Sequence, residues 1–212
     1  MIIRKNPKIR FPNPDPQRVP PGQFVTTQWP VLHAGGVPRI DLATWTFVVT
    51  GEVENPLRLT WEEFGRLPRS GRRNDVHCVT HWTRLDNDWE GVPVREVLRL
   101  ARPTPEARFV IEHAVGGWTT NVPLADFDRD ENLFATHHGG KPLTPEHGWP
   151  MRVVIPHLYF WKGAKWCKGI ELTREDRAGF WEVQGYHMRG DPWTESRFRS
   201  DDERGASEGS GL

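Results

Sequence analysis

The chain has 212 residues, which is long enough for one domain with its own hydrophobic core. Its 28 Lys and Arg residues balance its 28 Asp and Glu residues, so the overall charge does not indicate binding to nucleic acid or to an anionic membrane. No segment approaches the roughly 20 apolar residues of a membrane span, and no apolar stretch follows the basic start M-I-I-R-K-N-P-K-I-R, so we expect a cytoplasmic protein without a membrane span.

Prolines dominate the first 40 residues, at positions 7, 12, 14, 16, 20, 21, 30 and 38. Residues 1–40 are therefore predicted to form an extended arm that lies over the domain and has little regular structure. Near the end of this arm His33 precedes the pair Gly35 and Gly36, and glycine allows a backbone to approach a ligand closely. His33 is thus a candidate for ligand binding, and an exposed loop histidine is an equal alternative.

The first regular elements follow the arm directly. Aromatic and β-branched residues predict a strand over 45–50. Thr60 and Glu63 have the spacing of a capping box, so a helix is predicted to begin at this point. Gly65 and Pro68 follow soon after and keep that helix short.

The next stretch, residues 75–94, reads D-V-H-C-V-T-H-W-T-R-L-D-N-D-W-E-G-V-P-V. It places Cys78 near two histidines and two tryptophans, and we interpret its Gly-Val-Pro sequence as a turn. A helix is predicted from about Pro93 to just before Pro103, because Val94, Val97 and Leu98 share one face.

Short elements complete the domain. Strands are predicted at 109–113, 152–155 and 168–172, with a loop at 116–121 and a helical turn at 123–127. We find no internal repeat and no linker, so residues 41–199 are predicted to form one domain. Residues 200–212 lack apolar periodicity and are predicted to be a disordered tail.

Tryptophan and proline are unusually frequent, with 11 and 19 residues against two tyrosines. Many prolines favour strands joined by irregular loops over long helices. The tryptophans fit either a carbohydrate-binding surface or large core residues whose indole N–H groups are paired, and we favour the second interpretation.

Cys78 is the first candidate for chemistry. A thiolate is a soft ligand suited to a redox metal, and no second cysteine lies nearby to complete a zinc site or a redox dithiol. The alternative is a small buried apolar residue, which is the commoner role of a lone cysteine. Cys78 alone therefore does not decide the function.

A second cluster lies between residues 147 and 165 and contains His147, Arg152, Lys162, Gly163 and Lys165. Cationic groups on a strand and on the glycine-bearing loop after it suit an anion held by side chains and backbone N–H groups. An exposed basic face would be the ordinary interpretation of such a cluster. Trp149, Tyr159, Phe160, Trp161 and Trp166 lie among these cations and instead favour a partly buried anion site.

These two motifs together resemble the sulfite oxidase family of molybdopterin-dependent oxidoreductases. The run G-G-K-P-L-T-P-E-H-G-W-P-M-R-V-V-I-P-H-L-Y-F-W-K-G-A-K-W is similar to the family's pterin-binding motif. The segment C-V-T-H-W, followed by W-E-G-V-P-V, is similar to the sequence around its metal-binding cysteine. The nearest likeness is to the bacterial branch with the catalytic subunit of the methionine sulfoxide reductase system. The resemblance implies an α+β fold of the sulfite-oxidase type, with mixed strands, short helices and long irregular loops.

The resemblance also implies roles for individual residues. Cys78 would be the catalytic residue and the protein ligand of molybdenum in a molybdenum–molybdopterin cofactor. The pterin and its phosphate would be held by His147, Arg152, Gly163 and Lys165, with Lys162 in the same loop. His33 falls roughly where relatives place a residue beside the metal, and His113 is near a position that lines their cofactor pocket, although the residue identity differs there. His81, in the Cys78 segment, is a further candidate for cofactor binding.

The expected reaction is oxygen-atom transfer, with reduction of an S-oxide or an N-oxide preferred. Thr80, His81 and Trp82 follow Cys78 where sulfite-oxidising members have a Gly-Asn-x-Arg-like run, and Arg84 is the nearest permanent cation in the sequence. The substrate is therefore expected to be a small oxide or oxyanion, and a neutral oxide fits better because it needs no fixed positive charge. The sequence has no Cys-x-x-Cys-His motif for haem, so a separate electron-transfer protein is implied. Two alternatives remain: sulfite-type oxidation at the same centre, or a non-enzymatic, tryptophan-rich binding module.

Overall fold

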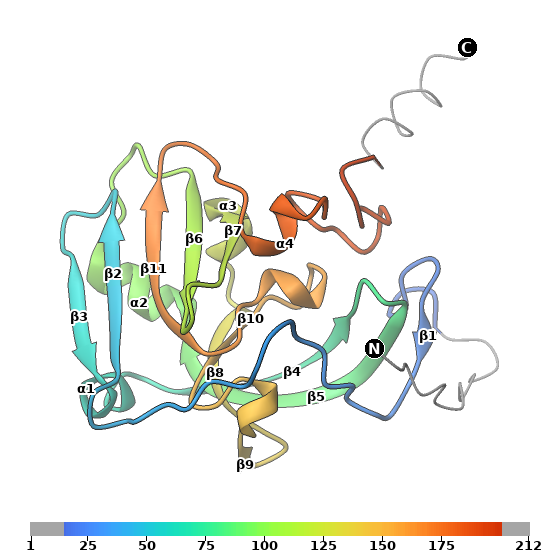
Figure 1. Cartoon of the computed structure of the whole chain (residues 1–212), viewed down its shortest axis with the longest axis horizontal. Helices are drawn as coiled ribbons and strands as arrows, with labels where there is room; N and C mark the ends of the chain where they lie inside the picture. Colours follow the sequence, from blue (N-terminus) through green and yellow to red (C-terminus); the bar gives the residue numbers. More distant parts are fainter. Residues whose placement is uncertain (1–14, 201–212) are drawn as a thin grey trace.

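The computed structural model describes residues 15–200, so the first 14 residues of the predicted arm and residues 201–212 of the predicted tail lie outside the described part. The fold is α+β, with mixed sheets and few short helices, as predicted. Figure 1 shows the two sheets side by side, with the long β4–β5 hairpin along the bottom of the view.

The first sheet contains the segment with Cys78. Within residues 15–200 its strands have the order β1-β5-β8-β10, with β4 on β5 and β9 on β8. Its strands are β1 (Phe24–Val25), β4 (Ser70–His77), β5 (Trp82–Pro93), β8 (Leu133–His138), β9 (Lys141–Pro142) and β10 (Arg152–Val154). All its pairs are antiparallel except β1 on β5.

The second sheet has the order β3-β2-β11-β6-β7. Its strands are β2 (Thr46–Gly51), β3 (Leu57–Thr60), β6 (Phe109–Ala114), β7 (Thr119–Pro123) and β11 (Cys167–Thr173). Strand β11 runs parallel to β2 and antiparallel to β6, and Ile170 and Leu172 on β11 are buried in the main core. The predicted strands at 45–50, 109–113, 152–155 and 168–172 are confirmed within about one residue at most ends.

Short helices connect and cover the sheets. They are α1 (Trp61–Gly65), α2 (Val94–Ala101), α3 (Leu124–Phe127) and α4 (Phe180–Val183), with 3-10 turns η1 (Pro145–His147) and η2 (Phe160–Lys162). The predicted capping box of α1 is present, because the Glu63 N–H donates to Thr60 Oγ1 at 3.2 Å and the Thr60 N–H donates to Glu63 Oε2 at 2.8 Å. The predicted apolar face of α2 is buried in the core.

Two sequence-based expectations are wrong. The Gly-Val-Pro sequence is the end of β5 and not a turn: Gly91 lies so close to β8 that an added Cβ would meet the Phe134 oxygen at 2.1 Å. The predicted loop at 116–121 is shorter than expected, because β7 begins at Thr119 and pairs with β6. At Gly91, pairing with β8 more than 40 positions later overrides the local turn signal, and at β7 hairpin pairing with the neighbouring β6 extends the strand into the predicted loop.

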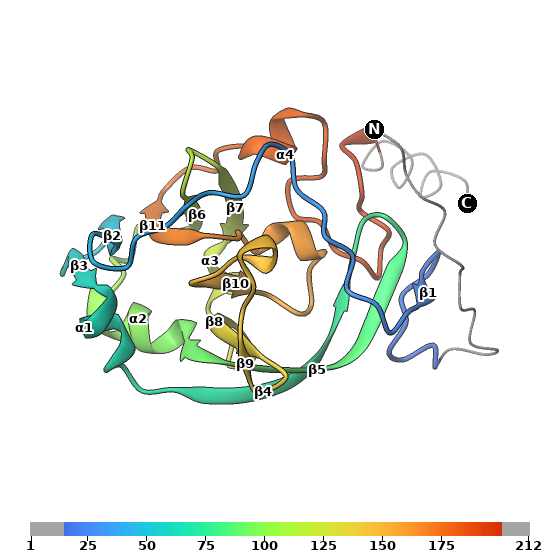
Figure 2. The same ribbon diagram turned by 60° about the horizontal axis from the view of Figure 1, so that its bottom comes forward.

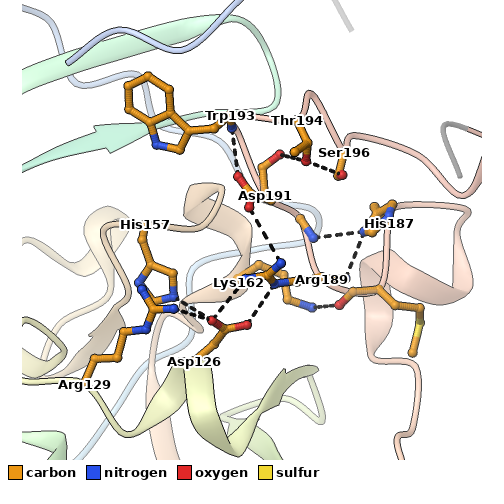
Figure 3. Close-up of polar contacts among 12 residues, drawn as sticks. Asp126, Arg129, His157, Lys162, His187, Arg189, Asp191, Trp193, Thr194 and Ser196 are labelled. Atoms are coloured by element: carbon orange, nitrogen blue, oxygen red, sulfur yellow. Dashed lines mark hydrogen bonds and ion pairs between the residues drawn. The ribbon is translucent and has the colours of Figure 1, made fainter. Parts of the chain in front are cut away.

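Segments near both ends of the described part contact its regular elements, since β1 pairs with β5 and the segment after α4 contacts α3. After β1, the arm crosses from the first sheet to the second, as the blue segment of Figure 2 shows. The segment after α4 is held by a buried carboxylate, since Asp126 accepts from Arg189 Nε at 3.0 Å and from Arg129 at 2.9 Å (Figure 3). No helix among residues 15–200 is long and apolar enough to cross a membrane.

Candidate functional site

A cavity of about 350 Å³ lies where the arm, the β4–β5 turn, the loop after β10 and the segment around α4 meet. Cys78, Arg152, Gly163, Lys165 and His33 all line it, so the structure brings together five of the residues that the sequence predicts. No Asp or Glu of the described residues lines the cavity. The wall, as far as the described residues form it, therefore carries a thiol, an arginine, a lysine and a histidine, and no carboxylate.

Cys78 occupies the turn between β4 and β5. Its backbone N–H donates to the Trp82 oxygen at 2.8 Å, and its own oxygen accepts from the His81 N–H at 3.0 Å. The sulfur lies 3.1 Å from Thr80 Oγ1. Burial raises the pKa of the thiol, while the Thr80 hydrogen bond and the charges of Arg197 and Lys165 lower it. A bound cation would keep the thiolate form, because a metal replaces the proton.

Arg152 is 1% exposed and has no carboxylate partner among residues 15–200. Its guanidinium donates to the carbonyl oxygens of Val153, His147 and Gly163, at 3.3, 3.4 and 3.2 Å. It also lies 3.8 Å from the centre of the Phe160 ring. Burial lowers the pKa of Arg152 to about 9.

Lys165 has a similar environment. Its Nζ donates to the oxygens of Leu32 and Glu146, at 2.9 and 2.8 Å. Burial first, and then the charge of Arg152, lower the pKa of Lys165 to about 7. Burial favours the neutral forms of these two neighbouring side chains, and a bound anion would stabilise their charged forms. The donor set therefore fits the phosphate of a pterin cofactor, with the single thiol of Cys78 in the same cavity.

Histidines from distant segments support this wall. His147 stacks on Trp29 with ring centres 3.9 Å apart, and Trp29 lines the cavity. His147 itself lies behind Trp29 and outside the set of lining residues. His33 lines the cavity and meets Trp166 edge to face at 5.6 Å.

Lys162 lies outside the cavity wall, and all three donors of its ammonium group are occupied. Its Nζ donates to Asn121 Oδ1 at 2.8 Å, to Glu182 Oε1 at 2.7 Å and to the Met188 oxygen at 2.7 Å. Figure 3 shows it among the polar contacts that hold the segment after α4. This geometry supports a structural ion pair and gives no donor to a cofactor phosphate.

Two further predicted residues also lie outside the wall. His81 is exposed, and its Nδ1 is 2.9 Å from the Gly22 oxygen. His113 pairs with Glu171 at 3.2 Å on the second sheet. Neither arrangement supports a direct contact with a cofactor in this cavity, so both assignments stay predictions.

Arg197 is a residue near the thiol that the sequence did not indicate. It is 7% exposed, donates to the oxygen of Val79 at 2.7 Å and lies 5.0 Å from the Tyr159 ring centre. Arg84, the nearest cation in the sequence, instead donates to the Thr27 oxygen and contacts His138. Arg84 is thus the nearest permanent cation in the sequence but contacts other groups, whereas Arg197, from the far end of the described chain, contacts the residue next to Cys78.

Glu112 is a second residue that was missed. It is fully buried on β6, and its Oε2 accepts from the N–H of Ala164, a lining residue, at 2.6 Å. Burial raises the pKa of Glu112 to about 8. The sequence could have indicated this buried carboxyl, because Glu112 lies within the largely apolar run F-V-I-E-H-A of a predicted strand.

The described residues contain no group of three or more His, Cys, Asp or Glu side chains that could hold a metal ion. Both cysteines are free. Among the described residues that line the cavity, Cys78 is the one thiol, so it is the candidate protein ligand for a metal whose other ligands come with a cofactor.

Comparison with known families decides the assignment. Residues 34–181 match the family model of the oxidoreductase molybdopterin binding domain. The chain belongs to this family. It is a molybdopterin-binding oxidoreductase of the sulfite oxidase type, as the two motifs predicted. The alternative of a non-enzymatic binding module is not supported.

Relatives agree with the family assignment. An uncharacterized oxidoreductase of Bacillus subtilis, YuiH, is 54% identical over 87% of this chain and 93% of its own length. The catalytic subunit of protein-methionine-sulfoxide reductase from Campylobacter jejuni is 29% identical over 68% of this chain. The chain spans about half, 54%, of that relative's length.

A solved structure confirms the fold. The sulfane dehydrogenase SoxCD from Paracoccus pantotrophus superimposes with a TM-score of 0.59 at 21% identity. The match covers 66% of this chain and 41% of that chain. At this identity the likeness concerns the fold alone.

Proposed function

We propose that this protein binds molybdenum as molybdenum–molybdopterin, with Cys78 as the protein ligand, and reduces a neutral S-oxide or N-oxide. The observation that carries the proposal is one cavity that holds the buried thiol of Cys78 together with Arg152 and Lys165. When bound, the cofactor would supply two-electron oxygen-atom transfer. The overall reaction consumes two electrons and two protons, and yields the reduced sulfide or amine and water.

The residues of the chain have separate tasks in this proposal. Arg152 and Lys165 bind the phosphate of the cofactor and exchange contacts with backbone oxygens for charge-assisted hydrogen bonds. Gly163 allows close packing in the same loop, because a Cβ there would meet the Val153 oxygen at 2.3 Å. Thr80 lies beside the Cys78 sulfur and fixes its orientation.

Reduction of a neutral oxide fits the cavity better than binding of an anionic substrate. Among the described lining residues, the arginine and lysine side chains are those of Arg152 and Lys165. Both are assigned here to the phosphate of the cofactor, so neither is left to bind an anionic substrate. The name of the Campylobacter relative also refers to sulfoxide reduction. That relative is named as a catalytic subunit, which supports a separate electron-transfer protein as the electron donor.

Sulfite-type oxidation is the second candidate, and Arg197 is the observation that favours it. Its guanidinium donates to the oxygen of Val79, the residue next to Cys78, and its charge lowers the pKa of the Cys78 thiol against the effect of burial, which supports a permanent cation near the proposed metal position. Arg197 is also 3.5 Å from Glu195 and lies outside the set of lining residues. Its charge is thus partly compensated and set back from the cavity.

Steady-state kinetics of the cofactor-loaded protein distinguish these reactions. An artificial electron donor serves for methionine sulfoxide and trimethylamine N-oxide, and an artificial acceptor serves for sulfite. We expect a larger kcat/KM for an oxide than for sulfite, with cofactor-free protein as the background control. A larger kcat/KM for sulfite, lost in Arg197→Gln, would instead establish the second candidate.

A further inference from the structure

The wall of the cavity contains a second set of residues that the cofactor proposal does not use. Trp118, Trp161, Trp181 and Tyr186 line the same cavity as Cys78. They come from the β6–β7 turn, from η2, from α4 and from the segment after α4. We call these four residues the aromatic wall.

The four rings form a continuous series. Trp118 and Trp181 have ring centres 5.9 Å apart at 53°, and Trp181 and Tyr186 have centres 5.1 Å apart at 42°. Tyr186 and Trp161 have centres 5.2 Å apart at 76°. Successive rings are inclined to one another, so the wall is not flat and offers several ring faces and edges to one ligand.

Buried polar contacts hold the wall in place from behind. The Trp161 indole N–H donates to Glu182 Oε1 at 3.0 Å. Glu182 is fully buried and also accepts from Lys162 at 2.7 Å and from the Thr120 hydroxyl at 2.9 Å. On the other side Trp118 packs on Phe180, with ring centres 3.7 Å apart. The wall is therefore preorganised, which lowers the entropic cost of binding a ligand.

All four rings are partly exposed, which leaves apolar surface facing the cavity. Such surface favours a ligand with an apolar group, and flat groups gain additional ring contacts. A small hydrated oxyanion would gain little from four rings. A cationic ligand would be repelled by Arg152 and Lys165, and no carboxylate of the described residues lines the cavity to attract it.

We propose that the aromatic wall is the subsite for the substituent of a neutral organic sulfoxide that carries an aryl or similarly flat apolar group. This inference rests on the proposed function, which supplies the reduction of the sulfoxide. The four rings account for the preference for an aryl substituent. Tyr186 lies beyond residues 34–181, so the family match does not account for the complete wall.

The kinetic test compares methyl phenyl sulfoxide with dimethyl sulfoxide on the cofactor-loaded full chain. We expect kcat/KM to be at least about tenfold higher for methyl phenyl sulfoxide, because its ring would be buried on the wall. Trp181→Ala and Tyr186→Ala should each lower that kcat/KM about tenfold and reduce the preference for methyl phenyl sulfoxide over dimethyl sulfoxide, with pterin content nearly unchanged. Trp193→Ala is the matched control, since Trp193 is 41% exposed and lies outside the set of lining residues.

A binding test does not depend on turnover. Methyl phenyl sulfone has the same ring, and saturation-transfer NMR reports its binding to the cofactor-loaded protein. Sulfone binding that is lost in Trp181→Ala and kept in Trp193→Ala would support the subsite, even if no oxide were reduced and the proposed function failed. Oxide turnover without any preference for the aryl substrate, and with equal sulfone binding in all variants, would overturn the subsite. Loss of pterin from the wall variants would also overturn it, because the rings would then hold the cofactor.

Discussion

Arg152 and Lys165 are cations in a place where charge is costly. Burial lowers the pKa values of both, to about 9 and about 7, and both side chains use backbone oxygens as partners. Backbone oxygens carry only partial charge, so they compensate a buried cation less than an anion does. The two residues are therefore suited to bind an anionic group, which we propose is the phosphate of the cofactor.

Charge reversal at Arg152 or Lys165 should lower the content of bound molybdopterin. A charge-assisted hydrogen bond to phosphate contributes roughly 1.5–3 kcal/mol, so we expect at least about a tenfold weaker retention. Fluorescence of the released and oxidised pterin measures this content per folded chain. Lys168→Glu is the matched control, because Lys168 is exposed on β11 only three positions from Lys165. Equal pterin content in Arg152→Glu, Lys165→Glu and the control would place the phosphate elsewhere.

Motifs indicated several of these residues because their chemistry is local in the sequence. Cys78, Arg152, Gly163 and Lys165 belong to two short runs, and all four line the cavity. The motif could not show which of the two lysines, Lys162 or Lys165, faces the cavity, because both belong to the same loop. The structure separates them: Lys162 belongs to η2 and pairs with Glu182, while Lys165 reaches Leu32 and Glu146.

At the scale of elements, the β4–β5 hairpin presents Cys78 and η2 anchors the opposite side. Lys162 joins η2 to α4 through Glu182, and joins it to the following segment through the Met188 oxygen. Both charged groups of this pair are fully buried. The ion pair therefore holds η2, α4 and the following segment together behind the cavity wall, although neither residue lines the cavity.

Lys162→Met should destabilise the protein by about 3–5 kcal/mol, because Glu182 would remain buried without its cation. Urea unfolding measures this loss, and the double variant Lys162→Met, Glu182→Gln should recover part of it. Pterin content per folded chain should stay close to that of the unmodified protein. Loss of pterin without loss of stability would instead make Lys162 a cofactor ligand, as its place in the motif predicted.

The regular elements were predictable where a local pattern decides them. The capping box of α1 and the apolar face of α2 are such patterns, and both are present. Gly91 was misinterpreted because its small size serves contact with β8, which lies more than 40 positions later in the chain. Strand pairing of this kind leaves no local signal.

At the scale of the whole molecule, the cavity is built by segments from both ends of the described chain. The arm contributes Trp29 and His33, and the segment after α4 contributes Tyr186. Arg197 then returns to Val79, next to Cys78. These contacts join residues that lie far apart in sequence, so only the complete fold reveals them. The predicted domain limits and the cytoplasmic location stay predictions.

The central claim is that Cys78 is the protein ligand of molybdenum in this cavity. X-ray absorption spectroscopy at the molybdenum edge, on protein from a host that makes molybdopterin, tests it directly. Elemental analysis should first give about one molybdenum per chain, because there is one candidate thiolate site. Cys78→Ser should lose one Mo–S contact relative to the unmodified protein. Cys167→Ser should keep the full set, since Cys167 is buried in the core on β11. An unchanged Mo–S count in Cys78→Ser, or the loss of one contact in Cys167→Ser, would contradict this account.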